Sequence, residues 1–496
     1  MTSTRINRAD WIAGACGLIL AGALGASSLI LGYWLLVPVG VGFAFLVSYF
    51  AWVRISQRSI ERSIDGVTPN LLLIAVPTLL AASRISTQGA IAALIVVLVV
   101  SFLFDHRPSH QLGLTWACAL VPIFAAFIVL RPNYPSTSVN VVFFIVGCVA
   151  VVRAVKISKS RASAFVSLVD GVGLFVVVSV TLWLIGFRSD GIRTNGLENA
   201  LTGGERVVFP LANSLAATPN MAAVYCVGVL PIVLVSGRHR LPRLAVVVFC
   251  AIVFALTDAR VSLIATIIVA ACLIVLPRFV RVLAPITVAA TFVVPFVYAS
   301  FQQWVGNAVV QASSSVPWLV RPGEEASSLN QRDYIWTQTV DFFAQRVDWF
   351  HQLSGFGAYG HAASGASASY ASRFEGLGRD DLLLTPHNSA LQVLLDGGLF
   401  VLISFAIFLT WTAASLARRA RRSPYELAGL GMLLMLSVIS ITEVAISPTH
   451  AQPAWWVLLG VCVITYTRER STAVDLVQVT SLADRSSREN ADRGVS

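Results

Sequence analysis

The sequence predicts an all-α protein that crosses a membrane many times. Hydrophobic residues make up 56% of the 496-residue chain, charged residues make up only 12%, and the mean hydropathy is +0.77. A soluble chain would carry roughly a quarter charged residues. Apolar runs long enough to cross a hydrocarbon core of about 30 Å recur along most of the chain. The predicted fold class is therefore an all-α polytopic membrane protein.

The apolar segments divide into about fourteen candidate transmembrane helices. They are expected at 11–28, 32–53, 67–83, 89–104, 112–130, 139–155, 164–187, 219–236, 243–258, 260–276, 282–301, 388–416, 426–447 and 453–467. Segments 243–258 and 260–276 are each shorter than the ~20 residues of a straight span. One continuous helix would place Arg260 in the middle of the membrane and break the charge alternation downstream. Two short helices are therefore predicted.

Basic residues gather in alternate loops, which predicts the orientation of the chain. These loops lie at 54–62, 153–161, 238–243, 278–281 and 418–422. The positive-inside rule places them and both termini in the cytoplasm. The same alternation predicts three segments on the outer side of the membrane. They are the loops 188–218 and 257–260 and the large hydrophilic insertion 302–387. Membrane topology explains the net charge of +10, so no nucleic-acid partner is expected.

The predicted spans and loops divide the chain into five regions. These are N-terminal transmembrane helices (1–204), core transmembrane helices (205–301), one outer loop (302–387), C-terminal transmembrane helices (388–467) and a charged tail (468–496). The tail is expected to be disordered on the cytoplasmic side because it is poor in apolar residues. The first apolar stretch is too long for a cleavable signal, so it is expected to stay as an anchor. The seven cysteines all lie in apolar segments and predict neither a disulfide framework nor a metal site.

The outer loop is predicted to be partly helical. Apolar side chains recur at helical spacing from Trp336 to Phe350, and Asn330 can cap the start of this helix. Arg332 lies one turn before Trp336, so it continues the apolar stripe. The glycines and small residues of 355–374 then suggest a mobile backbone, either an active-site lid or acceptor-binding segment or a merely irregular loop.

Two arginines on the outer side are candidate site residues. Arg260 stands at the outer end of a span, and its alternative role is an interfacial arginine that pairs with Asp258. Arg332 is expected to be buried against the membrane helices, and the alternative is an exposed arginine at a helix start. A guanidinium group grips phosphate with two hydrogen bonds and does not lose its proton.

His387 is a candidate proton acceptor. It falls in the first turn of the next helix if Thr385 caps that helix and Pro386 takes the first position. The helix N-terminus and nearby arginines would then favour the neutral imidazole, which can accept a proton. The alternative is an ordinary interfacial histidine. A neutral base beside two fixed cations suits a reaction with an anionic leaving group such as a diphosphate.

Several catalytic motifs are missing from the sequence. It contains no Asp-x-Asp pair for a metal-bound nucleotide sugar, no P-loop, no His-Glu-x-x-His and no Gly-x-Ser-x-Gly. A soluble nucleotide donor and a metal-activated water are therefore not indicated. Neither a metal nor a cofactor is expected.

Four segments between about 205 and 400 carry a family resemblance. They are TPNMAAVYCVGVLPIVL (218–234), TDARVSLIATIIV (257–269), QRDYIW (331–336) with GFG (355–357), and HNSALQVLLDGGLF (387–400). In order, spacing and outer location they resemble the O-antigen ligase and O-antigen polymerase superfamily of bacterial membrane glycosyltransferases. Two positions depart from the usual pattern: Ala259 stands where the family has serine, and Asp396-Gly397 stands where Glu-Gly is common.

The resemblance implies a GT-C-like fold and metal-independent transfer of a glycan from a polyprenyl-diphosphate carrier. The transfer would occur at the outer face of the bacterial cytoplasmic membrane, during biosynthesis of a surface polysaccharide. By the matching motifs, Arg260 and Arg332 would hold the diphosphate and His387 would help to activate the acceptor hydroxyl. Asn388 and Asn220 are expected to add to substrate binding. The expected partners are the lipid-linked oligosaccharide donor, the bilayer, and a glycan, lipid, wall or protein acceptor.

Two alternatives stay open at this point. Ligase and polymerase cannot be separated because acceptors bind in variable loops. A transporter or flippase of lipid-linked saccharide is the alternative from another class, since about fourteen helices also suit that role. A flippase would line an internal cavity with polar residues and show related halves. The polar residues here gather in one outer loop, which favours the glycosyltransferase.

Overall fold

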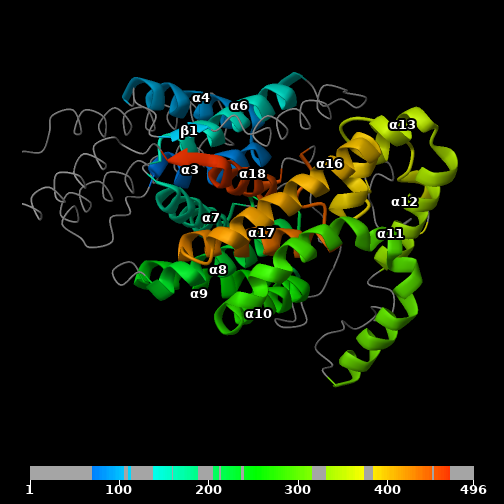
Figure 1. Ribbon diagram of the computed structural model, residues 1–496. Helices are drawn as coiled ribbons and strands as arrows, with labels where there is room; N and C mark the ends of the chain where they lie inside the picture. The colour runs from blue at the N-terminus through cyan, green and yellow to red at the C-terminus, as the bar shows by residue number, and fades with distance from the viewer. Residues whose placement is uncertain are drawn as a thin grey trace, which may run out of the picture.

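The computed structural model shows a helical bundle with one short pair of strands (Figure 1). It describes residues 70–104, 110–112, 138–158, 160–187, 205–211, 214–235, 240–315, 331–371, 373, 384–448 and 452–469. The predicted spans 11–28 and 32–53 lie outside these residues, as do both termini and all but the first residue of 112–130.

Each predicted span within the described residues is helical. The helices are α3 (Leu71–Ala81), α4 (Thr87–Phe104), α6 (Ser138–Lys156), α7 (Arg161–Leu184), α8 (Ala217–Val235), α9 (Arg240–Thr257), α10 (Arg260–Val275), α11 (Pro277–Ser315), α12 (Arg332–Arg346), α13 (Trp349–Ser354), α14 (Gly360–Ala363), α15 (Ala368–Ala371), α16 (Ser389–Arg419), α17 (Pro424–Thr442) and α18 (Pro453–Tyr466). A short 3₁₀ turn, η2 (Ala82–Arg84), follows α3. Strand β1 (His110–Leu112) pairs antiparallel with β2 (Thr467–Glu469).

Within the described residues, five helices are long and apolar enough to cross a membrane. They are Arg161–Leu184, Ala217–Val235, Pro277–Tyr298, Ser389–Arg419 and Pro424–Thr442. Shorter apolar helices include α3, α9, α10 and α18. The all-helical membrane class is therefore confirmed, whereas the total of about fourteen spans stays a prediction. Separate helices α9 and α10 confirm that 243–276 is not one continuous helix.

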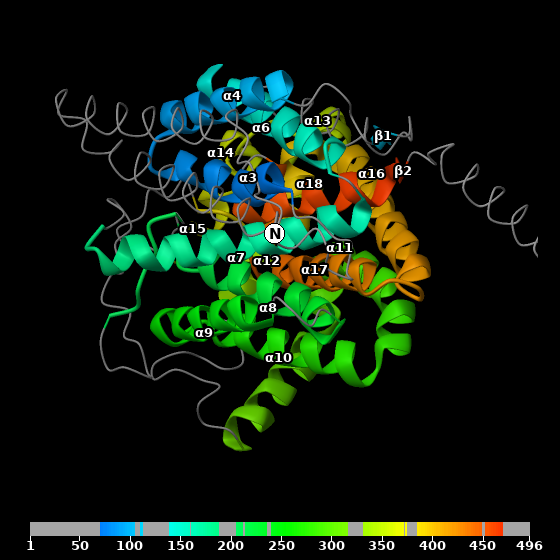
Figure 2. The same cartoon turned by 90° about the vertical axis from the view of Figure 1, so that its left-hand side faces the viewer.

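Helix α17 lies inside the bundle, between α18 on one side and α8 on the other (Figures 1 and 2). Small residues allow its neighbours to approach closely, because a side chain at Gly429 would collide with the ring of Phe165 on α7. A side chain at Gly431 would meet Leu273 of α10. By contrast, helices α9, α10, α11 and α16 each expose large apolar side chains, which is the surface expected to face lipid.

Helix α11 is longer than the sequence predicted. The expected span ended at 301 and the outer loop began at 302, but the helix continues to Ser315. Its last turns project away from the bundle, and Trp304 on them is exposed (Figures 1 and 2). The boundary was placed too early because a hydropathy pattern registers loss of apolar residues, while a polar segment can still satisfy its backbone as a helix.

Candidate active site

Helix α16 is interrupted at Gly398, near the outer end predicted for it. Gly398 has φ 69° and ψ −173°, so the helical backbone breaks there. The carbonyls of Leu395 and Asp396, just before the break, accept hydrogen bonds from the backbone N–H groups of Phe356 (2.9 Å) and Gly357 (2.8 Å). The interrupted helix is thereby joined to the segment that follows α13.

Glycines make this junction possible. A side chain at Gly355 would collide with the carbonyl of Asp396, and one at Gly398 with the carbonyl of Leu353. A side chain at Gly360 would collide with the carbonyl of Leu395. The glycines of this loop were predicted to give a mobile backbone. The structure gives Gly355 and Gly360 of that loop, together with Gly398 of α16, a further role, which is to allow close contact between two backbones.

Asp396 ties three segments together at the same junction. Its Oδ1 accepts hydrogen bonds from the backbone N–H of Gly360 and from Nε2 of Gln392, both at 2.7 Å, and its Oδ2 accepts one from Ser447 Oγ at 3.2 Å. Asp396 is buried. A buried carboxylate is stable only when such donors compensate its lost hydration, so α14, α16 and the segment after α17 are held as one unit.

The short helix α13 is fixed beside this junction. Asp348 caps it by accepting hydrogen bonds from the backbone N–H groups of Phe350 and His351. The hydrogen bond from the His351 side chain (2.6 Å) lowers the pKa of Asp348. The ring of His351 stacks on Phe356 with centroids 4.6 Å apart. The GFG segment is thus held between α13 and α16.

Two of the candidate residues meet at a third, Glu443. Arg332, the first residue of α12, donates a hydrogen bond from Nη2 to Oε1 of Glu443 at 2.6 Å. Nδ1 of His387 lies 3.6 Å from the other carboxylate oxygen. The side chains of Arg332, His387 and Glu443 are 20%, 27% and 24% exposed, so all three remain within reach of a ligand. We call these residues the Glu443 cluster.

The predicted start of the His387 helix is wrong by three residues. Asn388, not Thr385, is the N-cap, and its Oδ1 accepts a hydrogen bond from the backbone N–H of Leu391 at 3.0 Å. His387 precedes the cap with φ 47°, outside the first turn. The helix N-terminus therefore contributes less to its electrostatics than expected, and the Glu443 carboxylate is its close charged neighbour.

Asn388 and Glu443 are both fixed by the backbone around them. Nδ2 of Asn388 donates to the carbonyl of Ile441 at 2.8 Å, and Asn388 is fully buried. The hydroxyl of Ser389 donates to the carbonyl of Glu443 at 2.8 Å and accepts from the N–H of Ala445 at 2.9 Å. The start of α16 and the end of α17 are thereby held in register, which positions the Glu443 cluster.

The predicted helix start at Asn330 is also corrected. Asn330 lies outside the described residues, and α12 has Gln331 as its N-cap, with φ 66° and no capping hydrogen bond from its side chain. The stripe from Trp336 is buried through Phe343 and Val347, but α12 ends at Arg346. Phe350 belongs to α13 and is exposed.

Arg260 forms a second ion pair, and this one is buried. Its Nε and Nη2 donate to the two oxygens of Asp258 at 2.8 and 3.1 Å. The side chains are 5% and 0% exposed. This is the pairing that the sequence offered as the alternative role for Arg260. Nearby, the hydroxyl of Ser262 donates to Oδ1 of the buried Asn220 on α8 at 2.7 Å.

The two arginine pairs lie toward the same end of the bundle. Helix α10 ends where α11 begins, and Arg281 near that turn donates to the carbonyl of Ala420 at the end of α16 (3.4 Å). That end of α16 leads directly into α17. Since α10 packs along α17, its first residue, Arg260, lies toward the opposite end of α17, where Glu443 follows.

Glu443 was missed in the sequence, although a signal was present. The segment 426–447 was predicted as one span, and Glu443 is an acidic residue within it. An ionisable residue in a predicted span is a candidate functional residue. The structure ends α17 at Thr442 and makes Glu443 its C-cap, so the carboxylate lies at the helix end and not in a span.

The fold and this site define a class of protein. It is a helical membrane protein in which the segment between α11 and α16 packs against an interrupted helix and brings charged residues to one end of the bundle. Residues 245–406 match the family model described as O-antigen ligase. The match confirms the resemblance to the O-antigen ligase and polymerase family over this segment, which includes Arg260, Arg332 and His387 but neither Asn220 nor Glu443. No curated protein matches the chain.

Proposed function

We propose that this protein is a membrane glycosyltransferase of the O-antigen ligase and polymerase type. It takes saccharide from a polyprenyl-diphosphate carrier at the outer face of the bacterial cytoplasmic membrane, on a GT-C-like fold. The family match over 245–406 supports this class of activity. The observation that carries the site is the Glu443 cluster, in which one carboxylate joins an arginine to a histidine.

The cluster suggests a division of roles during transfer. His387 takes the proton of the acceptor hydroxyl through Nε2, while Glu443 on the Nδ1 side orients the ring, as the third group does in other base-assisted reactions. The acceptor oxygen bonds to the anomeric carbon as the bond from that carbon to the diphosphate oxygen breaks. The diphosphate leaves on the polyprenyl chain. No metal is needed for this sequence of steps.

Arginines offset the charge that develops on the departing diphosphate. A guanidinium carries five N–H donors, so the bond from Arg332 to Glu443 leaves donors that can reach a phosphate oxygen. Arg260, at the same end of the bundle, is proposed to hold the second phosphate. Asn220 and Asn388 are proposed to support substrate binding, Asn220 by its contact with Ser262 and Asn388 by capping α16 beside His387.

The direct test is transfer from a lipid-diphosphate glycan by purified protein, with excess chelator present. The proposal expects full turnover under chelation. Among the described residues, no group of three His, Cys, Asp or Glu side chains could hold a metal. Loss of turnover that magnesium or manganese restores would contradict the metal-independent mechanism. A protein that moves the intact carrier across vesicles without transfer would instead support the transporter alternative.

Deletion of the protein from its cell separates the two forms of transferase. Short single-unit glycans on the surface would identify a lost polymerase. Full-length chains left on the lipid carrier would identify a lost ligase. If the protein is a ligase, its acceptor can be identified as the molecule that no longer carries the glycan in the deletion strain.

A further inference from the structure

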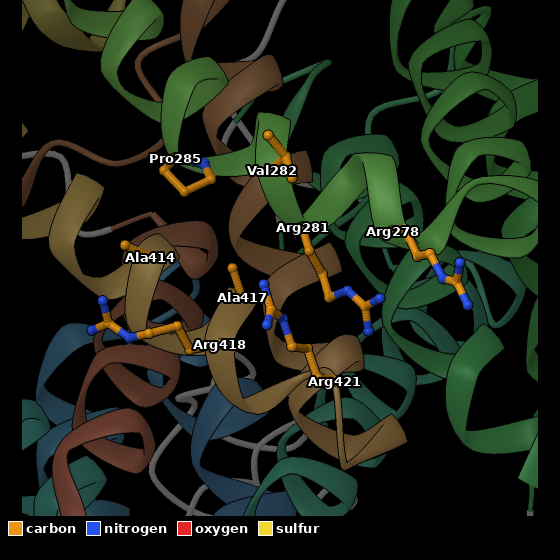
Figure 3. Close-up of a pocket in the computed structure, with 8 residues that line it drawn as sticks. All are labelled: Arg278, Arg281, Val282, Pro285, Ala414, Ala417, Arg418 and Arg421. Atoms are coloured by element: carbon orange, nitrogen blue, oxygen red, sulfur yellow. The ribbon is translucent and has the colours of Figure 1, made fainter.

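A basic pocket lies between α11 and α16, at the end of the bundle opposite the Glu443 cluster. Its volume is about 540 Å³. Four arginines line it, namely Arg278, Arg281, Arg418 and Arg421. Figure 3 shows Arg281 and Arg421 projecting into the space between the two helices, with Arg278 and Arg418 on either side. As far as the structure describes the chain, no acidic residue lines this pocket.

The backbone holds these arginines near one another. Arg278 and Arg281 belong to the first turns of α11, which begins at Pro277. Arg418 and Arg421 lie at the end of α16 and in the turn that follows it. The guanidinium of Arg281 donates to the carbonyl of Ala420 (3.4 Å), which fixes it across the gap between the helices. Four like charges in one pocket repel each other, so an anion placed among them would be bound favourably.

The positive charge of the pocket comes from its arginines, because the two helix ends beside it oppose each other. The first turns of α11 carry a partial positive charge, whereas the last turns of α16, which also line the pocket, carry a partial negative charge. Arg418 is held over the ring of Trp411 at 5.9 Å and donates to Ser415 Oγ at 3.3 Å. These contacts keep its charge at the rim of the pocket.

The pocket opens onto an apolar surface. Val282, which lines the pocket, is exposed, and so are Phe279 and Ile286 about one helical turn to either side of it. On α16, Trp411 and Ile407 are exposed about two and three turns before Arg418. Residues three or four apart share one face of a helix. The arginines therefore stand at the base of two exposed apolar stripes.

We propose that this pocket binds the phosphate headgroup of an anionic phospholipid, whose acyl chains lie along the exposed faces of α11 and α16. The arginines supply the charge-assisted contacts to the phosphate, and the apolar stripes receive the chains. A soluble phosphate would use only the first of these features. The alternation of basic loops places the site in the cytoplasmic leaflet. The site is thus distinct from the proposed transfer chemistry and does not depend on it.

Lipid retention by the purified full-length protein tests this assignment. The protein in neutral detergent is offered equal amounts of phosphatidylglycerol and phosphatidylcholine, and bound lipids are counted by native mass spectrometry. The parent protein should retain phosphatidylglycerol preferentially. Arg421→Gln should weaken that retention about fivefold, and Arg278→Gln with Arg421→Gln by about twenty-five-fold, the factors that correspond to about 1 kcal/mol per basic residue near an anionic surface.

Arg422→Gln is the matched control. Arg422 is exposed in the same turn as Arg421 but does not line the pocket, so this variant loses the same charge and should retain lipid like the parent. Equal losses for Arg421→Gln and Arg422→Gln would reduce the effect to general charge attraction and overturn the proposal. Equal retention of both lipids by the parent would also overturn it.

Inorganic phosphate separates a lipid from a soluble ligand. Added phosphate should displace the lipid only at concentrations far above that of phosphatidylglycerol, because it lacks the acyl contacts. Displacement at comparable concentrations would show a soluble phosphate site and overturn the lipid assignment. The midpoint of thermal unfolding should be unchanged in Arg421→Gln, because this exposed side chain makes no hydrogen bond within the described structure. A lower midpoint would assign the arginine a structural role instead.

Discussion

Glu443 changes the electrostatic character of the candidate site. The sequence offered two arginines and a neutral base, whereas the structure pairs each arginine with a carboxylate. A carboxylate beside His387 can orient the imidazole and stabilise it after it gains a proton. It also lowers the net positive charge that a diphosphate would meet. Catalysis would then depend on where the charges lie more than on how many there are.

Replacement of Glu443 by glutamine is expected to slow transfer about ten- to a hundredfold. The amide keeps the size of the side chain but loses the charge-assisted bond to Arg332, worth roughly 1.5–3 kcal/mol. The measurement is transfer as a function of pH, together with retention of the lipid-linked donor. Glu443 is a positioning residue, so the pH profile should shift while donor retention stays close to that of the parent.

Asp341→Asn is the control for this change. Asp341 is exposed on α12 and lies outside the Glu443 cluster, so its loss removes one negative charge without touching the site. Arg332→Lys should retain part of the activity because it keeps the charge but loses the planar fork. Parent rates and pH profiles in both Glu443→Gln and His387→Ala would contradict the catalytic role of the cluster.

The buried pair of Arg260 and Asp258 permits a second test at this scale. Arg260→Gln alone should destabilise the protein strongly, by about 3–5 kcal/mol, because the buried Asp258 carboxylate would lose both of its hydrogen bonds to the arginine. The double change Asp258→Asn with Arg260→Gln removes both charges and should recover most of the lost stability. Asparagine tolerates the φ of 50° at position 258.

The role of Arg260 can be tested by measuring both the transfer rate and the midpoint of unfolding of the double variant. If this arginine holds the diphosphate, the double variant should be stable but at least tenfold slower than the parent. A double variant that is both stable and fully active would show that the pair serves only the fold.

At the scale of elements, the segment between α11 and α16 depends on α16, and α16 depends on it. The kink at Gly398 leaves two carbonyls to accept hydrogen bonds from the GFG segment, and the absence of side chains at Gly355 and Gly360 lets the backbones meet. GFG (355–357) and DGG (396–398), which belong to two of the four segments that carry the family resemblance, are therefore two sides of one contact. That contact holds the backbone next to Asp396 and, through Ser447, the segment that carries Glu443.

Gly360→Ala is expected to destabilise the protein by about 3 kcal/mol. The added methyl group would collide with the carbonyl of Leu395, and backbone atoms cannot yield as a flexible side chain can. Gly365→Ala in the same loop is the control, since nothing lies within 4 Å of the added group there and only its φ of 80° costs about 1 kcal/mol. The two variants are compared by their midpoints of thermal unfolding. An equal decrease in both midpoints would show that the close contact at Gly360 contributes little to stability.

The sequence predicted those elements that leave a trace in hydropathy and charge. The separate helices α9 and α10 could be predicted because Arg260 cannot sit in the middle of a span. The kink at Gly398 could not, since glycine is common within transmembrane helices and a single backbone break does not alter the apolar pattern. The N-cap at Asn388 was missed because Thr385 and Pro386 form an equally good start signal.

At the scale of the whole molecule, the site residues come from widely separated parts of the chain. Arg260, Arg332 and His387 were predicted because each stands in a recognisable motif. Asp258 could be predicted as a partner of Arg260 because it lies two residues away. Glu443, the carboxylate beside Arg332 and His387, could not be predicted. Glu443 follows His387 by a whole pair of helices, and only the packing of α16 on α17 brings them together. A contact such as that between His387 and Glu443 can be found only once the packing of the helices is known.

The orientation of the molecule can be tested by labelling single cysteines from outside. Gln345 on α12 and Arg422 after α16 are both exposed, so each accepts a cysteine without disturbing the core. The alternation of basic loops predicts labelling at position 345 and protection at position 422 in intact cells. Labelling of the parent protein, measured in parallel, gives the background signal from its own seven cysteines. The reverse pattern would invert the topology and place the Glu443 cluster on the cytoplasmic side.

The junction at Gly398 also limits how this protein can be recombined with proteins that match the same family model. A loop taken from such a protein would arrive with its own glycine spacing, while the carbonyls that must receive it belong to α16. Hybrid proteins should therefore work only when 331–371 and 389–400 are exchanged as one cassette. Acceptor preference, if it resides in the loop, would then be inherited together with the first turns of the helix below it.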